Sequence, residues 1–179
     1  STCNEVLLMR HLLSKTTDKK QRAYLINHFL DQFKGTVYRQ TMFAEFELAM
    51  GKMAENGEAL TADALCRKYH ELNKLYFGPD MISDDQIALE WARIPHFFYN
   101  YYVFQYATGF SAAVALADRI LREGEPAVAD YKRFLSGGSS TDPISLLKLA
   151  GVDMSTPAPV DAALAMFGEL VDELDALTR

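Results

Sequence analysis

The chain has 179 residues, 49% of them hydrophobic, with 24 acidic against 18 basic side chains and a net charge of −6. This length is enough for one domain with a well-formed core. The acidic balance, together with the lack of a basic cluster in any segment, argues against nucleic acid as the main partner.

The first predicted element is an apolar helix over residues 1–14. Glu5 follows Thr2 at the spacing of a capping box, in which the two side chains satisfy the free N–H groups at the start of a helix. The chain begins at Ser1, inside this helical pattern, rather than at a methionine. We therefore expect it to be part of a longer protein.

A long amphipathic pattern predicts helix from Asp18 to about Glu55. Gly35 lies inside this pattern and weakens a helix by about 1 kcal/mol relative to alanine, so we expect a bend there. Arg39, Glu45 and Glu47 could serve a site. Charges on such a helix more often form a solvated face or a structural ion pair.

Thr61 begins the next predicted helix, which ends at Gly78, and Ser83 with Gln86 has the spacing of a capping box for a short helix through Trp91. Three more helices are predicted over residues 125–135, 142–150 and 159–179. Alternating strand patterns are not convincing anywhere. The predicted fold class is all-α, with residues 1–179 as a single helical unit.

The segment Ile94–Ala117 carries no formal charge and is the most aromatic part of the chain. It is long enough to span a membrane. That interpretation is unfavourable because His96, Asn100 and the tyrosines would have to find hydrogen-bond partners in lipid. Two interpretations remain: a core helix with tyrosine hydroxyls at its rim, or a helix that directs hydrogen-bond donors at a ligand.

Treated as one helix with Pro95 in its first turn, this segment places one imidazole and two phenols on a narrow face. The residues of that face are His96, Tyr99, Val103, Tyr106 and Phe110. Tyr102 lies at the edge of the face, and Tyr101 points the opposite way.

No zinc motif is complete in the sequence. His70-Glu71 begins like H-E-x-x-H, but Lys74 stands where the second histidine is required. Cys3 and Cys66 have no companion at zinc-ligand spacing, so we expect free thiols in a reducing compartment.

Four stretches of the chain carry a resemblance to oligoendopeptidase F, a zinc metallopeptidase related to thimet oligopeptidase. They occur in the same order as in that family: Tyr38–Glu47, Leu60–Gly78, Arg93–Gly109 and Leu149–Met154. The resemblance implies the multi-helix C-terminal portion of a zincin-like oligopeptidase catalytic domain.

The resemblance also implies roles for individual residues. His96, Tyr99 and Tyr106 correspond to the family's histidine and tyrosines that contact substrate and steady the tetrahedral intermediate, and Tyr102 is a further substrate-binding candidate. In the related thimet enzymes, a longer, glycine-rich connection joins this histidine to the tyrosine paired with Tyr99. Glu5 would lie two helical turns after the family's third zinc ligand, where its carboxylate could orient a zinc-bound histidine.

In the resembling enzymes, both zinc histidines, the general-base glutamate and the third ligand precede the residue that matches Ser1. We therefore expect zinc in the parent enzyme, but neither catalytic zinc nor peptide cleavage in this chain alone. The expected partners are oligopeptide substrates, the preceding part of the same protein and, through an exposed apolar surface, a second copy. The resemblance implies a bacterial-type cytoplasmic enzyme. The alternative is a helical module that binds a peptide or a partner without catalysis.

Overall fold

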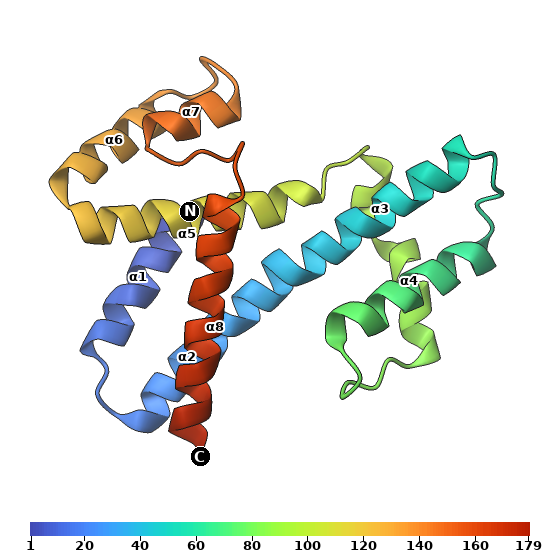
Figure 1. The fold of residues 1–179 in the computed structure, drawn as a ribbon, viewed down its shortest axis with the longest axis horizontal. Coiled ribbons are helices and arrows are strands. Elements are labelled where there is room, and N and C mark those ends of the chain that lie inside the picture. The colour runs from blue at the N-terminus through green and yellow to red at the C-terminus, as the bar shows by residue number, and fades with distance from the viewer. The chain divides into compact units, whose positions relative to one another are not determined.

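The computed structural model describes residues 1–179 and contains helices but no β-strand (Figure 1). This confirms the predicted all-α class. In chain order, the elements are α1 (Thr2–Lys15), α2 (Lys19–Phe33), η1 (Lys34–Tyr38), α3 (Arg39–Glu55), α4 (Ala62–Phe77), η2 (Asp85–Arg93), η3 (Pro95–Phe98), α5 (Phe104–Glu123), α6 (Glu125–Ser136), α7 (Pro143–Leu149) and α8 (Ala158–Thr178).

Contacts within the chain group into two compact units. Unit 1 comprises Ser1–Lys34 and Thr108–Arg179, and unit 2 comprises Gly35–Ala107. Each unit has buried apolar side chains of its own. The expectation of a single domain over residues 1–179 stays a prediction.

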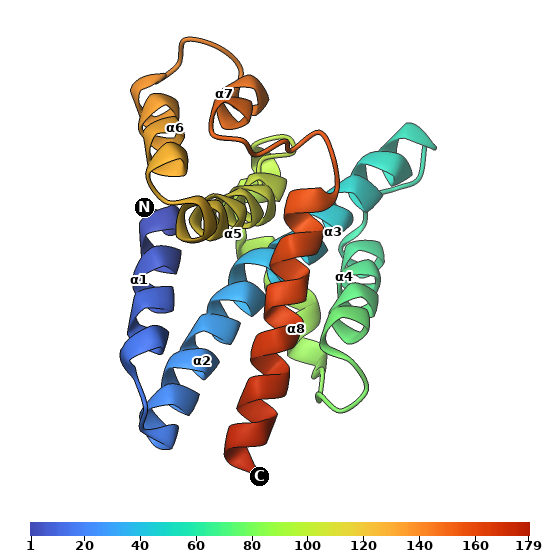
Figure 2. The same cartoon turned by 60° about the vertical axis from the view of Figure 1, so that its left-hand side comes forward.

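In unit 1, α2 and α8 lie side by side (Figures 1 and 2). Phe33 is fully buried, and its ring centroid lies 4.8 Å from that of Phe110 and 5.7 Å from that of Phe167. These edge-on and tilted ring contacts join helices from the two ends of the chain. The α2 part of the amphipathic pattern predicted for residues 18–55 therefore packs against α5 and α8 in this core.

In unit 2, α4 packs against α3 and against η2. Phe46 and Tyr69 are fully buried, with ring centroids 5.2 Å apart and ring planes nearly perpendicular. Phe97, from η3, packs on Phe46 at 5.3 Å. This aromatic core is the support on which the residues after Ile94 lie.

Two predicted helix starts are confirmed by their hydrogen bonds. Thr61 accepts from the backbone N–H of Ala64 at 3.2 Å, and Asp142 accepts from that of Ser145 at 2.9 Å. Both side chains satisfy backbone donors that have no partner within the helix.

The two predicted capping boxes are wrong. Thr2 already lies inside α1, and its N-cap residue, Ser1, makes no side-chain cap hydrogen bond. At the second site Asp84 is the cap, because its carboxylate accepts from the backbone N–H of Ile87 at 2.9 Å. The hydroxyl of Ser83 instead donates to Asn73 at 2.7 Å.

The predicted helix over residues 18–55 is divided by η1, a π-helical turn that contains Gly35. A π-helical turn inserts an extra residue into the helical hydrogen-bond pattern. The irregularity expected at Gly35 is therefore present as a π turn between α2 and α3.

The prediction of one helix through Ile94–Ala117 is wrong. The 3₁₀ turn η3 ends at Phe98, and α5 begins only at Phe104. Between them, Asn100 and Tyr101 have positive φ angles of 43° and 60°. The right-handed α-helix requires negative φ, so these residues interrupt it.

Glu90 is a buried carboxylate of η2, in unit 2. Its oxygens accept hydrogen bonds from the Tyr69 hydroxyl at 2.6 Å and from the Arg39 guanidinium at 2.6 Å, and Arg93 donates as well. Burial alone would raise the pKa of Glu90, but the hydrogen bonds from Tyr69 and the two arginines outweigh burial and lower it. Glu90 thereby ties η2 to α3 and α4.

We expect Glu90→Ala to lower the free energy of unfolding by about 3 kcal/mol at neutral pH, because Tyr69 and Arg39 lose a buried acceptor. Urea unfolding followed by the fluorescence of Trp91, the single tryptophan, measures the loss of stability in unit 2.

Because the native pKa of Glu90 is lowered, the contribution of Glu90 to stability is present above the unfolded pKa of about 4.3 and is lost as the pH falls through the native pKa. The control is Glu71→Ala, which removes an exposed ion pair with Lys68 and should change stability by less than about 1 kcal/mol. Equal effects of the two substitutions would contradict this role for Glu90.

Candidate functional site

Four side chains of unit 2 come together around one imidazole. We call His96, Tyr99, Tyr102 and Tyr106 the His–Tyr cluster. The hydroxyl oxygen of Tyr106 lies 3.2 Å from Nε2 of His96. The Tyr102 ring stacks on the imidazole at a centroid distance of 5.7 Å and an interplanar angle of 19°. The Tyr99 ring meets the imidazole edge-on at 6.2 Å.

The cluster is built from three consecutive parts of the chain. His96 lies in η3, Tyr99 and Tyr102 lie in the irregular segment, and Tyr106 is in the first turn of α5. Ile94 and Val103 are buried on either side of the segment and fix its two ends. The four side chains are therefore brought together by a 3₁₀ turn, a turn with positive φ angles and the first turn of α5. The sequence predicts one continuous helix in their place.

Of the residues that the sequence predicts on one helical face, the structure brings some together around His96 and buries others. His96, Tyr99 and Tyr106 are brought together, and Tyr102, predicted at the edge of the face, stacks on the His96 ring. Val103 and Phe110 were predicted on the same face, but both are buried in apolar surroundings. Phe110 follows Tyr106 by one turn of α5, so these two residues share a face of that helix, whereas His96 and Tyr99 precede the interruption.

The His–Tyr cluster is accessible to a ligand. Tyr99 is 62% exposed, whereas Tyr102 and Tyr106 are 39% and 38% exposed. A phenol donates one hydrogen bond through its hydroxyl, and an imidazole donates through whichever nitrogen carries the proton. The arrangement can therefore offer several hydrogen-bond donors to an oxygen-rich ligand such as a peptide.

Tyr106 keeps its proton well beyond neutral pH. Its hydrogen bond with Tyr102, with burial as a smaller cause, raises the pKa of Tyr106 above the ordinary phenol value. An ordinary phenol is already protonated at neutral pH, with a pKa of about 10. The cluster therefore keeps Tyr106 in the form that donates a hydrogen bond.

Glu47 is one of three charged residues, with Arg39 and Glu45, that the sequence offers as possible site residues, and it contacts the segment that carries the His–Tyr cluster. It is 6% exposed rather than solvated, and it accepts a hydrogen bond from the backbone N–H of Tyr101 at 2.7 Å. Its presence in the segment Tyr38–Glu47, which carries part of the family resemblance, is the sequence signal that favours a site over a solvated charge.

Glu5 lies apart from the His–Tyr cluster in sequence, on α1 of unit 1. Its Oε1 accepts a hydrogen bond from the Ser1 hydroxyl at 2.7 Å, and its side chain is exposed. The expected role of Glu5 beside a zinc-bound histidine stays a prediction.

The chain's own residues do not fit a catalytic zinc ion. No group of three or more histidine, cysteine, aspartate or glutamate side chains is arranged to hold a metal ion. Protein zinc sites use three or four such ligands. Cys3 and Cys66 are both free thiols.

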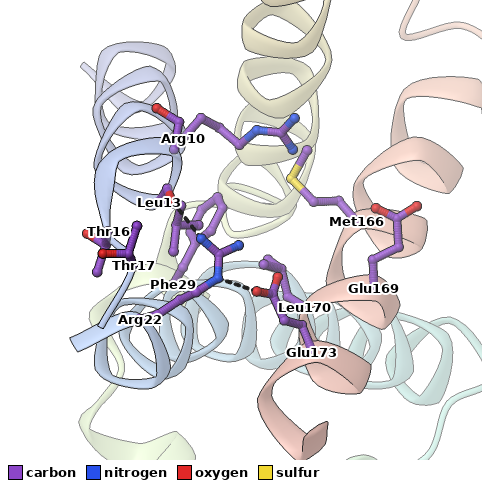
Figure 3. Close-up of a pocket in the computed structure, with 11 residues that line it drawn as sticks. Arg10, Leu13, Thr16, Thr17, Arg22, Phe29, Met166, Glu169, Leu170 and Glu173 are labelled. Atoms are coloured by element: carbon purple, nitrogen blue, oxygen red, sulfur yellow. Dashed lines mark hydrogen bonds and ion pairs between the residues drawn. The ribbon is translucent and has the colours of Figure 1, made fainter. Parts of the chain in front are cut away.

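A separate cavity of about 550 Å³ lies in unit 1 between α1, α2 and α8 (Figure 3). The guanidinium of Arg22 donates to the Leu13 carbonyl at 2.6 Å and forms an ion pair with Glu173. The hydrogen bond with Glu173 is the main cause that raises the pKa of Arg22. Arg22 therefore already binds groups of its own chain, and its ion pair with Glu173 joins α2 to α8 at this cavity.

The helices offer no membrane span, because none is both long and apolar enough to cross a bilayer.

The fold and the cluster define a class: an all-helical protein that presents histidine and tyrosine donors on an accessible aromatic surface. Comparison with known proteins narrows the class. The sequence profile of Peptidase family M3 matches residues 1–166, and the chain belongs to that family.

Named relatives agree with this assignment. The chain is 56% identical to oligopeptidase PepF of Bacillus subtilis over 99% of its own length and 26% of that protein. It is 46% identical to group B oligopeptidase PepB of Streptococcus agalactiae, over 99% of this chain and 30% of the relative. The crystal structure of oligoendopeptidase-F from Enterococcus faecium superposes with a TM-score of 0.96 at 49% identity, over 99% of this chain and 34% of that one. The chain thus spans between a quarter and about a third of these relatives.

We expect Tyr106 to ionise above the ordinary phenol pKa of about 10, because it gives up a hydrogen bond with Tyr102 when it loses its proton. Carbon-13 NMR of ring-labelled tyrosine measures the midpoint directly, with Tyr106→Phe used to assign the signal. In Tyr102→Phe the midpoint should fall toward the ordinary value. A native midpoint at or below the ordinary phenol value would contradict this arrangement.

Proposed function

We propose that the chain is the C-terminal part of a zinc metallo-oligopeptidase that hydrolyses internal bonds of short peptides. In this proposal, His96 and Tyr106 donate to the oxygen that gains charge in the tetrahedral intermediate, and Tyr99 and Tyr102 contact the peptide. The single observation that supports it is the 3.2 Å approach of the Tyr106 hydroxyl to His96 Nε2, with the Tyr102 ring stacked on the same imidazole.

Hydrogen-bond donors that are already in place are the kind of group this reaction needs. Such donors stabilise developing negative charge best when little has to move during the reaction. In this proposal, the Tyr106 hydroxyl proton turns from its neighbours in the cluster to the substrate oxygen. Contacts with Tyr99 and Tyr102 restrict the His96 ring, and the contact between His96 and Tyr106 restricts the Tyr106 phenol. The rest of the machinery, including the metal, belongs to the remaining length of the parent protein.

The family assignment supports the reaction class. The relatives that match over nearly the whole of this chain are named oligopeptidases or oligoendopeptidases. Because the chain covers only part of each, cleavage by the parent and inactivity of this part alone are both proposals.

A second candidate function is a helical module that binds a peptide or a partner without catalysis. The observation that favours it is the lack of a metal-ligand cluster in the chain beside an accessible set of donors. A reading frame that continues upstream into H-E-x-x-H would decide for the peptidase. A start codon close to Ser1 would decide for the module.

We expect the purified chain to bind no catalytic zinc and to leave an oligopeptide intact, because its own side chains form no ligand cluster. The same protein extended upstream to the length of its relatives should bind zinc and cleave. Metal analysis and cleavage of a fluorogenic peptide, run on both forms with and without a chelator, measure this. Chelator-sensitive cleavage by the chain alone would overturn the proposal that zinc binding and cleavage need the upstream part of the protein.

In the extended form, we expect Tyr106→Phe and His96→Ala to lower kcat by about 100- to 1,000-fold, the usual loss for one oxyanion donor. Tyr99→Phe should mainly raise KM, because the more exposed phenol contributes to binding. Steady-state kinetics with one peptide measure both effects. Tyr24→Phe, at a 72% exposed residue on α2, is the control and should leave both constants unchanged. Unchanged kcat in Tyr106→Phe and His96→Ala would remove the proposed role.

A further inference from the structure

We propose that Glu47 is a positioning residue for the His–Tyr cluster. Its carboxylate holds the backbone turn at residues 99–101, and the turn in turn orients Tyr99 and Tyr102 against His96. The catalytic consequence of this inference rests on the proposed function, whereas its structural part can be tested without it.

The turn cannot be explained by local preference. Asn100 and Tyr101 both have positive φ, in the left-handed region. Asparagine tolerates this conformation, but for tyrosine the Cβ atom crowds the following carbonyl oxygen. Residues held in such conformations persist where the surrounding structure constrains them. An interaction from outside the turn is therefore required.

Glu47 supplies that interaction from α3, 54 positions earlier in the chain. Its Oε1 accepts from the Tyr101 N–H at 2.7 Å, a short distance typical of a bond to a charged acceptor. The glutamate is 6% exposed. A buried carboxylate needs donors to offset its lost hydration, so the bond benefits both partners. Loss of this hydrogen bond removes the contact that holds Tyr101, the most strained residue of the turn, in its positive-φ conformation.

Gly51 makes room for the same turn, one helical turn after Glu47. A Cβ atom added to Gly51 would lie 2.8 Å from the Tyr101 hydroxyl oxygen, closer than carbon and oxygen atoms can approach without movement. Residues four apart share one face of a helix. The backbone of Tyr101 is therefore held, and its side chain accommodated, by a single face of α3.

The turn is where the orientation of the cluster is set. Tyr99 precedes the two strained residues and Tyr102 follows them, and their rings meet edge-on at 6.3 Å. Both rings also contact His96. A change in the backbone angles of Asn100 and Tyr101 would move one ring relative to the other. Glu47 acts on the imidazole through this path and not by touching it.

NMR of the chain tests the structural part. In the native protein the His96 ring protons should be shifted upfield, because the Tyr102 ring is stacked on the imidazole. In Glu47→Ala we expect this upfield shift to be lost and the Tyr101 amide to exchange faster with solvent. Glu45→Ala is the matched control: it removes an exposed carboxylate from the same helix, bonded to Tyr76, and should leave His96 unchanged. Native His96 shifts in a folded Glu47→Ala protein would overturn the proposal.

Glu47→Gln keeps the test decisive if Glu47→Ala does not fold. Its neutral amide oxygen can still accept, but more weakly. The Tyr101 amide proton should therefore move upfield while the His96 signals stay near their native positions. A Tyr101 amide proton that does not respond to this substitution would overturn the proposal.

Kinetics of the upstream-extended form test the consequence for activity. We expect Glu47→Ala to lower kcat by at least tenfold, Glu47→Gln to restore most of it, and Glu45→Ala to match the native protein. If the native extended form does not cleave peptides, the proposed function fails and the NMR result still decides the positioning role. If it cleaves and a folded Glu47→Ala protein cleaves equally well, the positioning role fails while the proposed function stands.

Discussion

The His–Tyr cluster depends on hydrogen bonds from other elements, because residues 85–103 form few of the strong, regular hydrogen bonds of an α-helix. η2 and η3 are 3₁₀ turns, whose hydrogen bonds have poorer geometry, and the next residues have positive φ. Such a segment takes one shape only when other elements hold it. Two buried carboxylates of unit 2 do so, Glu90 through three side-chain donors and Glu47 through one backbone donor.

The regular helices could be predicted from the sequence, because their signals are local. Apolar residues at helical spacing, Thr61 and Asp142 as caps, and Gly35 as an irregularity all act within a few positions of themselves. The interruption at Asn100 and Tyr101 could not be predicted in the same way. Its cause is a glutamate 54 positions away, and the uncharged sequence around it has the composition of a continuous helix.

The same reasoning explains which site residues were found. His96, Tyr99 and Tyr106 were identified through the family resemblance, and the calculated helical face agreed although the helix itself does not exist. The left-handed turn brings Tyr102 onto the imidazole, whereas an unbroken helix would have left it at the edge. For Glu47 the sequence leaves a site residue and a solvated or ion-paired charge both open, because helix periodicity cannot tell a carboxylate buried by a distant loop from one that faces water.

A binding site on the protein surface has to hold its hydrogen-bond donors in one orientation while leaving them accessible to the ligand. Tyr99, Tyr102 and Tyr106 keep more than a third of their surface in solvent, so a ligand can reach them, but exposed side chains ordinarily sample several rotamers. In this chain, contacts among the rings restrict that freedom, because each of the three tyrosines touches the His96 ring. Ring contacts of this kind order the side chains only if the backbone beneath them has one conformation. The buried carboxylate of Glu47 therefore fixes the backbone at Tyr101. Because that backbone is fixed, the exposed tyrosine donors can be both accessible to a ligand and ordered.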